Sequence, residues 1–368
     1  MKSEVLQALR RVVEPTSGKD IVRLGMVKGL QASGGAVAFT VVVADPSSPF
    51  AKEVKAAAER AVHERLGEQV RVRVDVDNEV MGIGEVQSGG GRQGQTVQPR
   101  GVRNFIAVAS GKGGVGKSTV AANLAVALAR QGYDVGLADA DIYGPSIPTM
   151  FGVRDEKPRV NQDRKIVPIE RFGVKLLSMG FLVDATQAVI WRGPMVSSAL
   201  RQFLGDCDWG ELDYLVLDLP PGTGDIQLTL VQSIALTGAV IVSTPQEVAL
   251  ADARKGVAMF ESVNVPVLGI VENMAYFTPP DLPDRKYHLF GEGGARRLAA
   301  ELKVPFLGEV PIEQSVRETG DAGRPVVMEA PESLSARAFE AVARQAAEQV
   351  DLRNAETPAT QKVEILYR

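Results

Sequence analysis

The sequence predicts an α/β protein in which a mainly parallel sheet carries helices on both faces, preceded by a small N-terminal α+β domain. Two observations indicate this fold. Short apolar runs alternate with helical patterns through most of the chain, which is typical of a parallel sheet. A stretch rich in glycine and glutamine, at 87–100, separates that part from the N-terminal residues, because such a composition cannot form a packed core.

The composition is that of a globular protein, with 45% hydrophobic and 23% charged residues among 368. Lysine and arginine total 41 and aspartate and glutamate 45, so the net charge of −4 argues against a general nucleic-acid or anionic-membrane binder. The N-terminus is charged and amphipathic, and no run of about 18 apolar residues occurs. We therefore expect no signal peptide, no membrane span and a cytoplasmic location.

Four segments are expected along the chain. They are a small α+β domain at 1–85, a flexible linker at 86–100, a large α/β domain at 101–350 and a polar tail at 351–368. In the small domain, apolar spacing and turn residues predict helices and strands in turn. These are a helix at Ser3–Val13, strands at Ile21–Leu30 and Ala36–Ala44, a helix from Pro49 to Leu66, and a strand at Val70–Val76.

The large domain is expected to contain seven apolar strands with helices between most of them. The strands are predicted at Asn104–Ala109, Asp134–Ala138, Val174–Ser178, Tyr214–Asp218, Ala239–Thr244, Val267–Glu272 and Phe306–Val310. A last amphipathic helix is predicted at Pro331–Val350.

The segment Gly111–Ser118, GKGGVGKS, fits the pattern G-x-x-x-x-G-K-[ST] between a predicted strand and a predicted helix, as a phosphate-binding P-loop requires. Glycines let the backbone approach phosphate, and the helix N-terminus adds partial positive charge. Lys117 is expected to neutralise the β- and γ-phosphates, Ser118 to ligate Mg²⁺ and Thr119 to contact the α-phosphate. The predicted ATP-binding residues of this loop are Gly111, Lys112, Gly113, Gly114, Val115, Gly116, Lys117, Ser118 and Thr119.

Acidic residues follow two of the predicted strands. Asp218 ends an apolar strand ahead of a Gly/Pro-rich turn, which favours a role beside Mg²⁺ over simple capping. In that turn, Gly222 is a candidate N–H donor to the γ-phosphate. Asp139 and Asp141 follow the second strand of the large domain. We favour Asp141 as the residue that orients the attacking water, while Asp139 either supports the Mg²⁺ shell or caps a turn.

Lys112, directly after the first glycine of the P-loop, resembles the deviant Walker A signature of MinD/ParA-type ATPases. The combined motifs resemble the Mrp/ApbC branch of iron–sulfur cluster carrier ATPases across nearly all of 101–345. These motifs are ASGKGGVGKST, DADIYGPSIP, WRGPM, LDYLVLDLPPGTGD, STPQEVALADARKG, VENMAYF and HLFGEGG. The first 85 residues are similar, more weakly, to the small domain often fused to bacterial Mrp proteins.

This resemblance implies a homodimeric Mg²⁺-dependent ATPase, slow without a partner, that delivers iron–sulfur clusters to client apoproteins. It implies that Lys112 reaches the phosphates bound by the partner subunit, and that Lys112, Lys117 and Asp141 are catalytic. It further implies that Asn273 meets the adenine base and that Pro311 belongs to the other wall of the base pocket.

The family places a C-x-x-C soon after the VENM segment, but residues 276–288 contain no cysteine. Four thiolates per dimer would otherwise hold the cluster. Cys207, the one cysteine of the chain, and His288 could together supply a two-Cys, two-His cluster in a dimer. Nothing in the sequence brings the two residues together, so a small semi-buried cysteine and a loop or packing histidine are the simpler interpretation. The cluster ligands therefore remain unassigned. The alternative function is a metal-free regulatory ATPase switch acting on a protein client. A ParA- or MinD-like positioning ATPase, acting on DNA or a membrane, fits less well.

Overall fold

The computed structural model describes the chain except residues 46–47, 79–98, 143, 182–192 and 358–368. Two compact units are present. Residues 1–91 and 348–368 form the N-terminal unit, and residues 92–347 form the large unit. Among the described residues, no helix is both long and apolar enough to cross a membrane.

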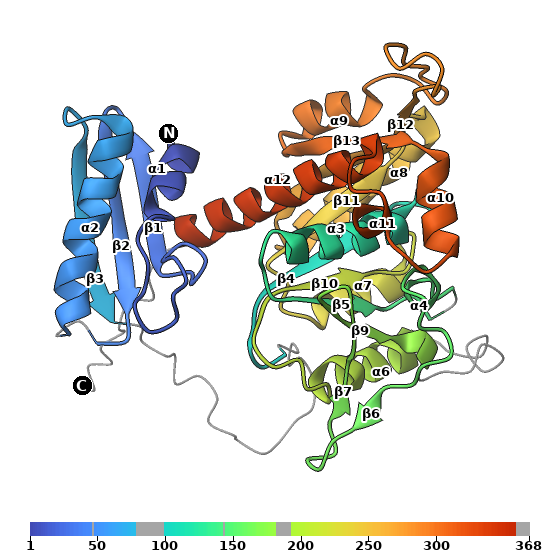
Figure 1. Ribbon diagram of the computed structural model, residues 1–368, viewed down its shortest axis with the longest axis horizontal. Coiled ribbons are helices and arrows are strands. Elements are labelled where there is room, and N and C mark those ends of the chain that lie inside the picture. The colour runs from blue at the N-terminus through green and yellow to red at the C-terminus, as the bar shows by residue number, and fades with distance from the viewer. Residues whose placement is uncertain (46–47, 79–98, 143, 182–192, 358–368) are drawn as a thin grey trace. The chain divides into compact units, whose positions relative to one another are not determined.

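The N-terminal unit is a three-stranded sheet with helices packed on one face (Figure 1). Strand β2 lies in the middle, antiparallel to β1 and parallel to β3. Alternate residues of β2 are buried, and these are Val37, Phe39, Val41 and Val43. Its elements are α1 (Lys2–Leu9), β1 (Val27–Ser33), β2 (Ala36–Val43), α2 (Pro49–Leu66) and β3 (Arg71–Asn78).

The first strand of this unit begins later than its apolar pattern predicts. The prediction starts it at Ile21, whereas β1 begins at Val27. The Asp20 carboxylate accepts hydrogen bonds from the backbone N–H of Val22 (3.1 Å) and Arg23 (2.8 Å), which curls the chain into a turn. A local side-chain contact therefore overrides the apolar run.

The large unit is built on an eight-stranded sheet in the order β13-β12-β11-β4-β10-β5-β9-β8. All neighbouring pairs are parallel except β8 and β9. The strands of this sheet are β4 (Val102–Ala109), β5 (Val135–Asp139), β8 (Ile169–Arg171), β9 (Val174–Ser178), β10 (Leu212–Asp218), β11 (Gly238–Ser243), β12 (Val267–Phe277) and β13 (Phe306–Ile312). A separate short pair is β6 (Arg159–Val160) and β7 (Ile166–Val167).

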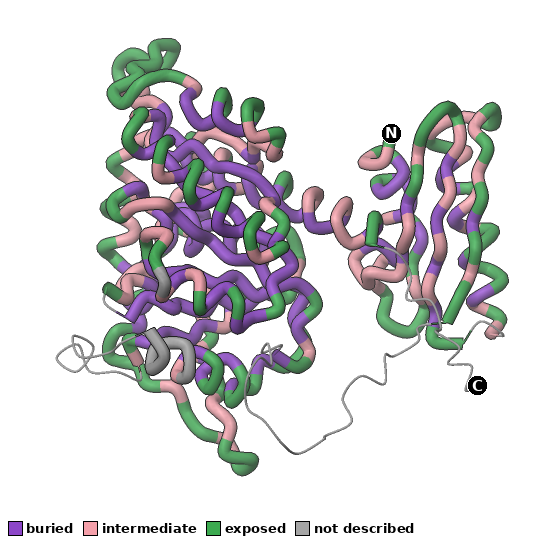
Figure 2. Tube along the Cα trace, turned by 180° about the vertical axis from the view of Figure 1, so that it is seen from behind, coloured by how far each residue is buried: buried purple, intermediate pink, exposed green. Residues whose placement is uncertain are grey.

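Helices cover both faces of this sheet, and most residues of its central strands are buried (Figures 1 and 2). One face shares a core with α6 (Gly193–Gly205), α7 (Asp225–Gln232), α8 (Glu247–Ser262) and α9 (Gly294–Leu302). The other face carries α3 (Lys117–Arg130) and the first part of α12 (Leu334–Glu356). The remaining helices among the described residues are the short elements α4 (Ile147–Met150), η1 (Met179–Phe181), α10 (Gln314–Asp321) and α11 (Val326–Glu329). The predicted α/β fold is confirmed, and all seven predicted strands are present.

The last helix continues past its predicted end. The prediction ends it at Val350 and assigns the rest to a polar tail, whereas α12 runs to Glu356. Its C-terminal part belongs to the N-terminal unit, where Ala355 joins the core and Asp351 is paired with Arg10. These contacts lie hundreds of residues apart in the sequence, so the pattern of the tail alone does not reveal them.

Candidate nucleotide-binding site

The predicted P-loop connects the buried strand β4 to the N-terminus of α3, at the carboxyl edge of the sheet. Gly116 caps the helix with φ of +80°, a left-handed conformation that glycine adopts without strain. The Asn273 amide lies directly against it, because a Cβ added at Gly116 would lie 2.2 Å from Asn273 Nδ2. The same Nδ2 donates a hydrogen bond to the Val115 carbonyl at 2.8 Å. The loop is therefore held against β12, the strand that carries Asn273.

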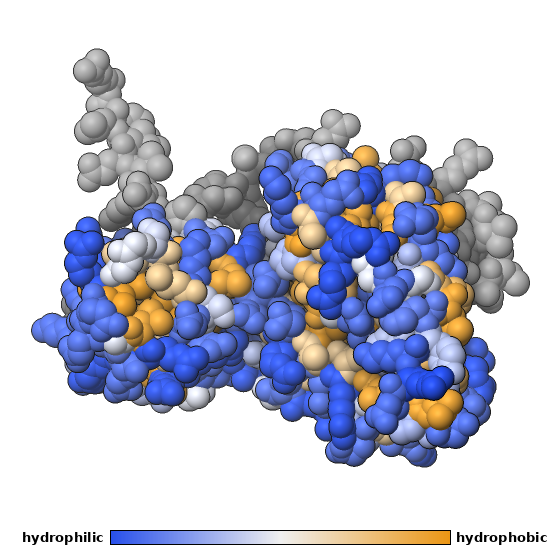
Figure 3. Space-filling view, turned by 90° about the horizontal axis from the view of Figure 1, so that it is seen from above, coloured by the Kyte–Doolittle hydropathy of each residue, from blue (hydrophilic) through white to orange (hydrophobic). Residues whose placement is uncertain are grey.

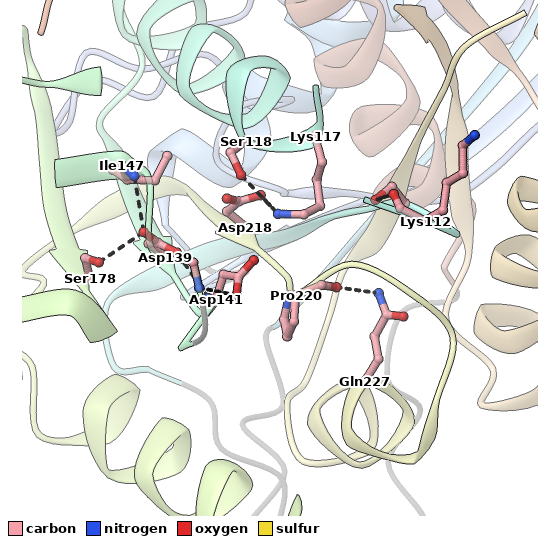
Figure 4. Close-up of polar contacts among 12 residues, drawn as sticks. Lys112, Lys117, Ser118, Asp139, Asp141, Ile147, Ser178, Asp218, Pro220 and Gln227 are labelled. Atoms are coloured by element: carbon pink, nitrogen blue, oxygen red, sulfur yellow. Dashed lines mark hydrogen bonds and ion pairs between the residues drawn. The ribbon is translucent and has the colours of Figure 1, made fainter. Parts of the chain in front are cut away.

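Lys117 and Asp218 form a buried ion pair behind the loop. Lys117 Nζ lies 2.6 Å from Asp218 Oδ1 and 3.1 Å from the Ser118 hydroxyl (Figure 4). Asp218 is fully buried, and within the described part of the chain its Oδ2 has no hydrogen-bond partner. An unpaired buried carboxylate oxygen is costly, so this atom is suited to receive a cation.

A second buried carboxylate lies beside the first. Asp139 and Asp218 are register neighbours on β5 and β10. Burial, with the charge of Asp218, raises the pKa of Asp139 to about 7. Burial also raises the pKa of Asp218, although Lys117 opposes that rise. Two buried carboxylates lie near the positive charge of Lys117. A divalent cation bound here would offset the repulsion between the carboxylates. Oxygen ligands of this kind, with the Ser118 hydroxyl, fit Mg²⁺.

The two acids that follow β5 occupy different positions. Asp139 accepts hydrogen bonds from the backbone N–H of Asp141 (3.1 Å) and Ile147 (3.2 Å) and from the Ser178 hydroxyl (3.0 Å). It therefore shapes the loop that carries Asp141. Asp141 accepts from the Gly144 N–H at 3.1 Å and lines a cavity of about 550 Å³ together with the turn after β10.

That turn is tied to the P-loop through its backbone. The Gly222 N–H, the predicted γ-phosphate donor, donates instead to the Ser110 carbonyl at 2.9 Å. Gln227 holds the Pro220 carbonyl through its Nε2 at 3.2 Å (Figure 4). Gln227 is 3% exposed and its Oε1 has no partner among the described residues. Sequence reasoning missed Gln227, since a glutamine inside a helical pattern carries no signal of its own.

A cavity of about 880 Å³ opens beside the loop. Asn273 and Pro311, the two residues expected around the base, both line it, as do Gly116 and Thr119. Pro311 is positioned through its carbonyl, which accepts from the Ser335 hydroxyl at 3.3 Å. The structure thus brings the phosphate-binding and base-binding candidates to one continuous site.

Lys112 differs from the other loop residues. Its side chain is half-exposed and points away from Lys117 and Asp218 (Figure 4). Only its backbone contributes to the loop, because the Ser110 hydroxyl donates to the Lys112 carbonyl at 2.9 Å. The side chain therefore does not serve the phosphate site of its own chain in this conformation.

The candidates for cluster ligation are not brought together. Cys207 is buried in the core of the large unit, and burial raises the pKa of its thiol to about 12, so it is protonated at neutral pH. His288 lies instead on the segment after β12, beside Tyr276 and Glu292. No group of three or more His, Cys, Asp or Glu side chains that could hold a metal occurs in the described ranges. Trp191 of the WRGPM motif falls outside those ranges.

The chain matches two family models and is similar to several known proteins. A family model described as "NUBPL iron-transfer P-loop NTPase" matches residues 101–347, and one described as "Iron-sulfur cluster assembly protein" matches residues 2–76. A protein of Synechocystis named "Iron-sulfur cluster carrier protein" is 50% identical over 353 residues, covering 95% of this chain and 97% of its own. A protein of the same name from Deinococcus radiodurans is 45% identical over 356 residues, covering 96% and 97%.

Solved structures agree with the fold. A nucleotide-binding protein from Archaeoglobus fulgidus in complex with ADP has 47% identity and a TM-score of 0.55, covering 61% of this chain and 87% of its own. The cell division ATPase MinD from Pyrococcus furiosus has a TM-score of 0.50, covering 66% of this chain and 97% of its own. Its 24% identity supports the fold alone. Because the first family model covers well over half of the chain, the protein belongs to the family of NUBPL iron-transfer P-loop NTPases.

Proposed function

We propose that this protein is a Mg-ATP-binding and ATP-hydrolysing homodimer that carries iron–sulfur clusters to client apoproteins in the cytoplasm. Nucleotide binding is supported above all by the buried Lys117–Asp218 ion pair, which lies beside Ser118 at the end of the P-loop. A lysine and an unpaired carboxylate oxygen at the N-terminus of a helix are the charges that Mg-ATP requires.

ATP binding exchanges the partners of these charges. The β- and γ-phosphates draw Lys117 away from Asp218, while the loop N–H groups and the N-terminus of α3 receive phosphate oxygens. Asp218 and the Ser118 hydroxyl are then available to hold Mg²⁺, with Asp139 behind them. When bound, Mg²⁺ neutralises charge on the transferring phosphoryl group. Asp218 thus exchanges its contact with Lys117 for a divalent cation.

Hydrolysis converts ATP and water to ADP and phosphate, slowly without a partner. Asp141 orients the attacking water, because it lines the cavity that adjoins the turn after β10. The Gly222 N–H leaves the Ser110 carbonyl for the γ-phosphate, so this turn distinguishes ATP from ADP. Lys112 reaches across the dimer to the phosphates of the partner subunit, which agrees with its outward direction.

The assignment of an iron–sulfur cluster as the cargo depends on similarity to other proteins. Relatives that match nearly the whole chain are named iron–sulfur cluster carrier proteins. The residues present do not themselves form a cluster site, since Cys207 is buried and protonated and residues 276–288 contain no cysteine. This disagreement favours a second candidate function, a metal-free ATPase switch that acts on a protein client such as an apo iron–sulfur protein or an assembly factor.

Anaerobic reconstitution with iron and sulfide separates the two functions. Iron and sulfide per dimer are assayed for the wild type and for Cys207→Ala, alongside ATP hydrolysis. A stoichiometric cluster in the wild type establishes the carrier, and its loss in Cys207→Ala would identify this thiol as a ligand. Hydrolysis without any cluster would overturn cluster carriage by the isolated chain and support the switch.

A further inference from the structure

The segment between β12 and α9, residues 278–293, lies at the top of Figure 1. It carries large apolar side chains that are exposed to solvent. Residues 281–290 are all exposed, including Leu289 at 60% and Phe290 at 36%. In Figure 3, which views this face from above, hydrophilic residues dominate and apolar ones appear in small groups. Large apolar side chains left in water in this way are suited to cover a ligand.

Leu289 and Phe290 border the candidate nucleotide-binding site. Both line the 880 Å³ cavity, together with Asn273, Met274 and Pro311. These neighbours include the two residues expected to contact the base. The exposed pair therefore borders the end of the cavity where the adenine ring would lie.

Both ends of the segment are fastened near Asn273. Glu272, buried and adjacent to Asn273 on β12, accepts a hydrogen bond from the Ala295 N–H at the start of α9, at 2.5 Å. At the other end, Phe277 and Tyr287 exchange backbone hydrogen bonds of 2.9 and 2.8 Å. The portion between Tyr287 and α9, which contains Leu289 and Phe290, is thus short and tethered on both sides. A small shift is enough to change its contact with a ligand in the cavity.

We propose that Leu289 and Phe290 form a wall of the base cavity that closes on the adenine ring of the bound nucleotide. This inference rests on the proposed nucleotide site and adds two binding residues to it. The faces of adenine are planar and apolar, so they pack against a phenylalanine ring and a leucine side chain. Closure also moves the exposed part of this segment, so the charged surface that includes Asp281, Asp284 and Arg285 differs between the free and nucleotide-bound protein.

Trypsin reports this closure, because Arg285 and Lys286 are exposed on the same segment. Cleavage there is followed by mass spectrometry with no nucleotide, with Mg-ADP and with Mg-triphosphate, which lacks the base. Nucleotide affinity is measured separately by calorimetry. Leu289→Ala and Phe290→Ala are compared with Leu282→Ala, a matched control that is 42% exposed on the same segment but does not line the cavity.

In the wild type, Mg-ADP is expected to slow cleavage at Arg285–Lys286 by about fivefold or more, and Mg-triphosphate to leave it unchanged. Leu289→Ala and Phe290→Ala should each raise the Kd for ADP by about three- to tenfold and remove the protection. Leu282→Ala should behave as the wild type. Binding of ADP without protection, or unaltered affinity in both variants, would overturn the inference while leaving the nucleotide site intact. A wild type that binds no nucleotide would overturn both.

Discussion

The P-loop requires glycine at position 116 because of its φ angle and its contact with Asn273. Its φ is +80° and the Asn273 amide occupies the space where a Cβ would lie. Gly116→Ala should therefore lower the free energy of unfolding of the large unit by about 2 kcal/mol, from backbone strain and loss of the Asn273–Val115 hydrogen bond. Thermal unfolding without nucleotide measures this. Gly113→Ala, where a Cβ meets open space, is the control, and equal losses in both variants would refute the argument.

The buried Asp351 is expected to make the stability of the N-terminal unit depend on pH. Burial raises its pKa from 3.8 to about 6, although Arg10 opposes this. The folded protein holds that proton more tightly than the unfolded chain, so this residue makes stability fall as pH rises from about 4 to 6. Asp351→Asn removes the titration. Relative to wild type, the variant should gain at most about 1.4 kcal/mol per pH unit across that window.

Hydrogen exchange of peptides from β2 and α2, at pH 4.5 and pH 7, measures this difference. The exposed Asp75→Asn serves as the control. The prediction fails if the stability difference between Asp351→Asn and wild type is the same at both pH values.

Among the elements, the C-terminal part of α12 has the least expected role. Lys28 Nζ donates to the Asn354 carbonyl at 3.4 Å, and the Gly29 N–H donates to the Thr357 carbonyl at 3.0 Å. Lys2 pairs with Glu356 at 2.7 Å, and Ala355 is buried in the core. The N-terminal unit therefore needs a piece of chain from the far end of the sequence to complete its fold.

Removing residues 348–368 should destabilise the N-terminal unit by about 2–3 kcal/mol, through lost apolar burial and ion pairs. A chain that ends after Thr357 keeps all of these contacts and is the matched control. Amide exchange in β1 and α1 should accelerate only in the shorter chain. Equal protection in the two truncated chains would show that α12 is dispensable for this unit.

The elements also show what the sequence can and cannot predict. Continuous apolar runs predicted all seven long strands because both faces of a parallel sheet are buried. The short strands β6, β7 and β8 lack such a run and were not predicted. The P-loop and Asp218 could be placed because each combines a local motif with a strand end. Gln227, Glu272 and Phe290 could not, since their contacts depend on segments brought together only by folding.

For the whole molecule, the central structural question is whether two copies share their nucleotides. Lys112 is half-exposed and points away from the phosphate site of its own chain. If it completes the site of a partner, Lys112→Ala should abolish the dimer that Mg-ATP induces while leaving the fold unchanged. Light scattering with and without Mg-ATP measures this, with the exposed Lys157→Ala as control. An ATP-dependent dimer of Lys112→Ala would rule out the shared site.

Phosphate release from Mg-ATP, measured for Lys117→Ala, wild type and Lys157→Ala, tests whether Lys117 acts in nucleotide hydrolysis. Lys117 links the P-loop to Asp218 and is the cation expected to stabilise charge on the transferring phosphoryl group. We expect the rate of ATP hydrolysis to fall by about 100-fold or more in Lys117→Ala and to be unchanged in Lys157→Ala. Near-normal turnover by Lys117→Ala would contradict the assignment of this site.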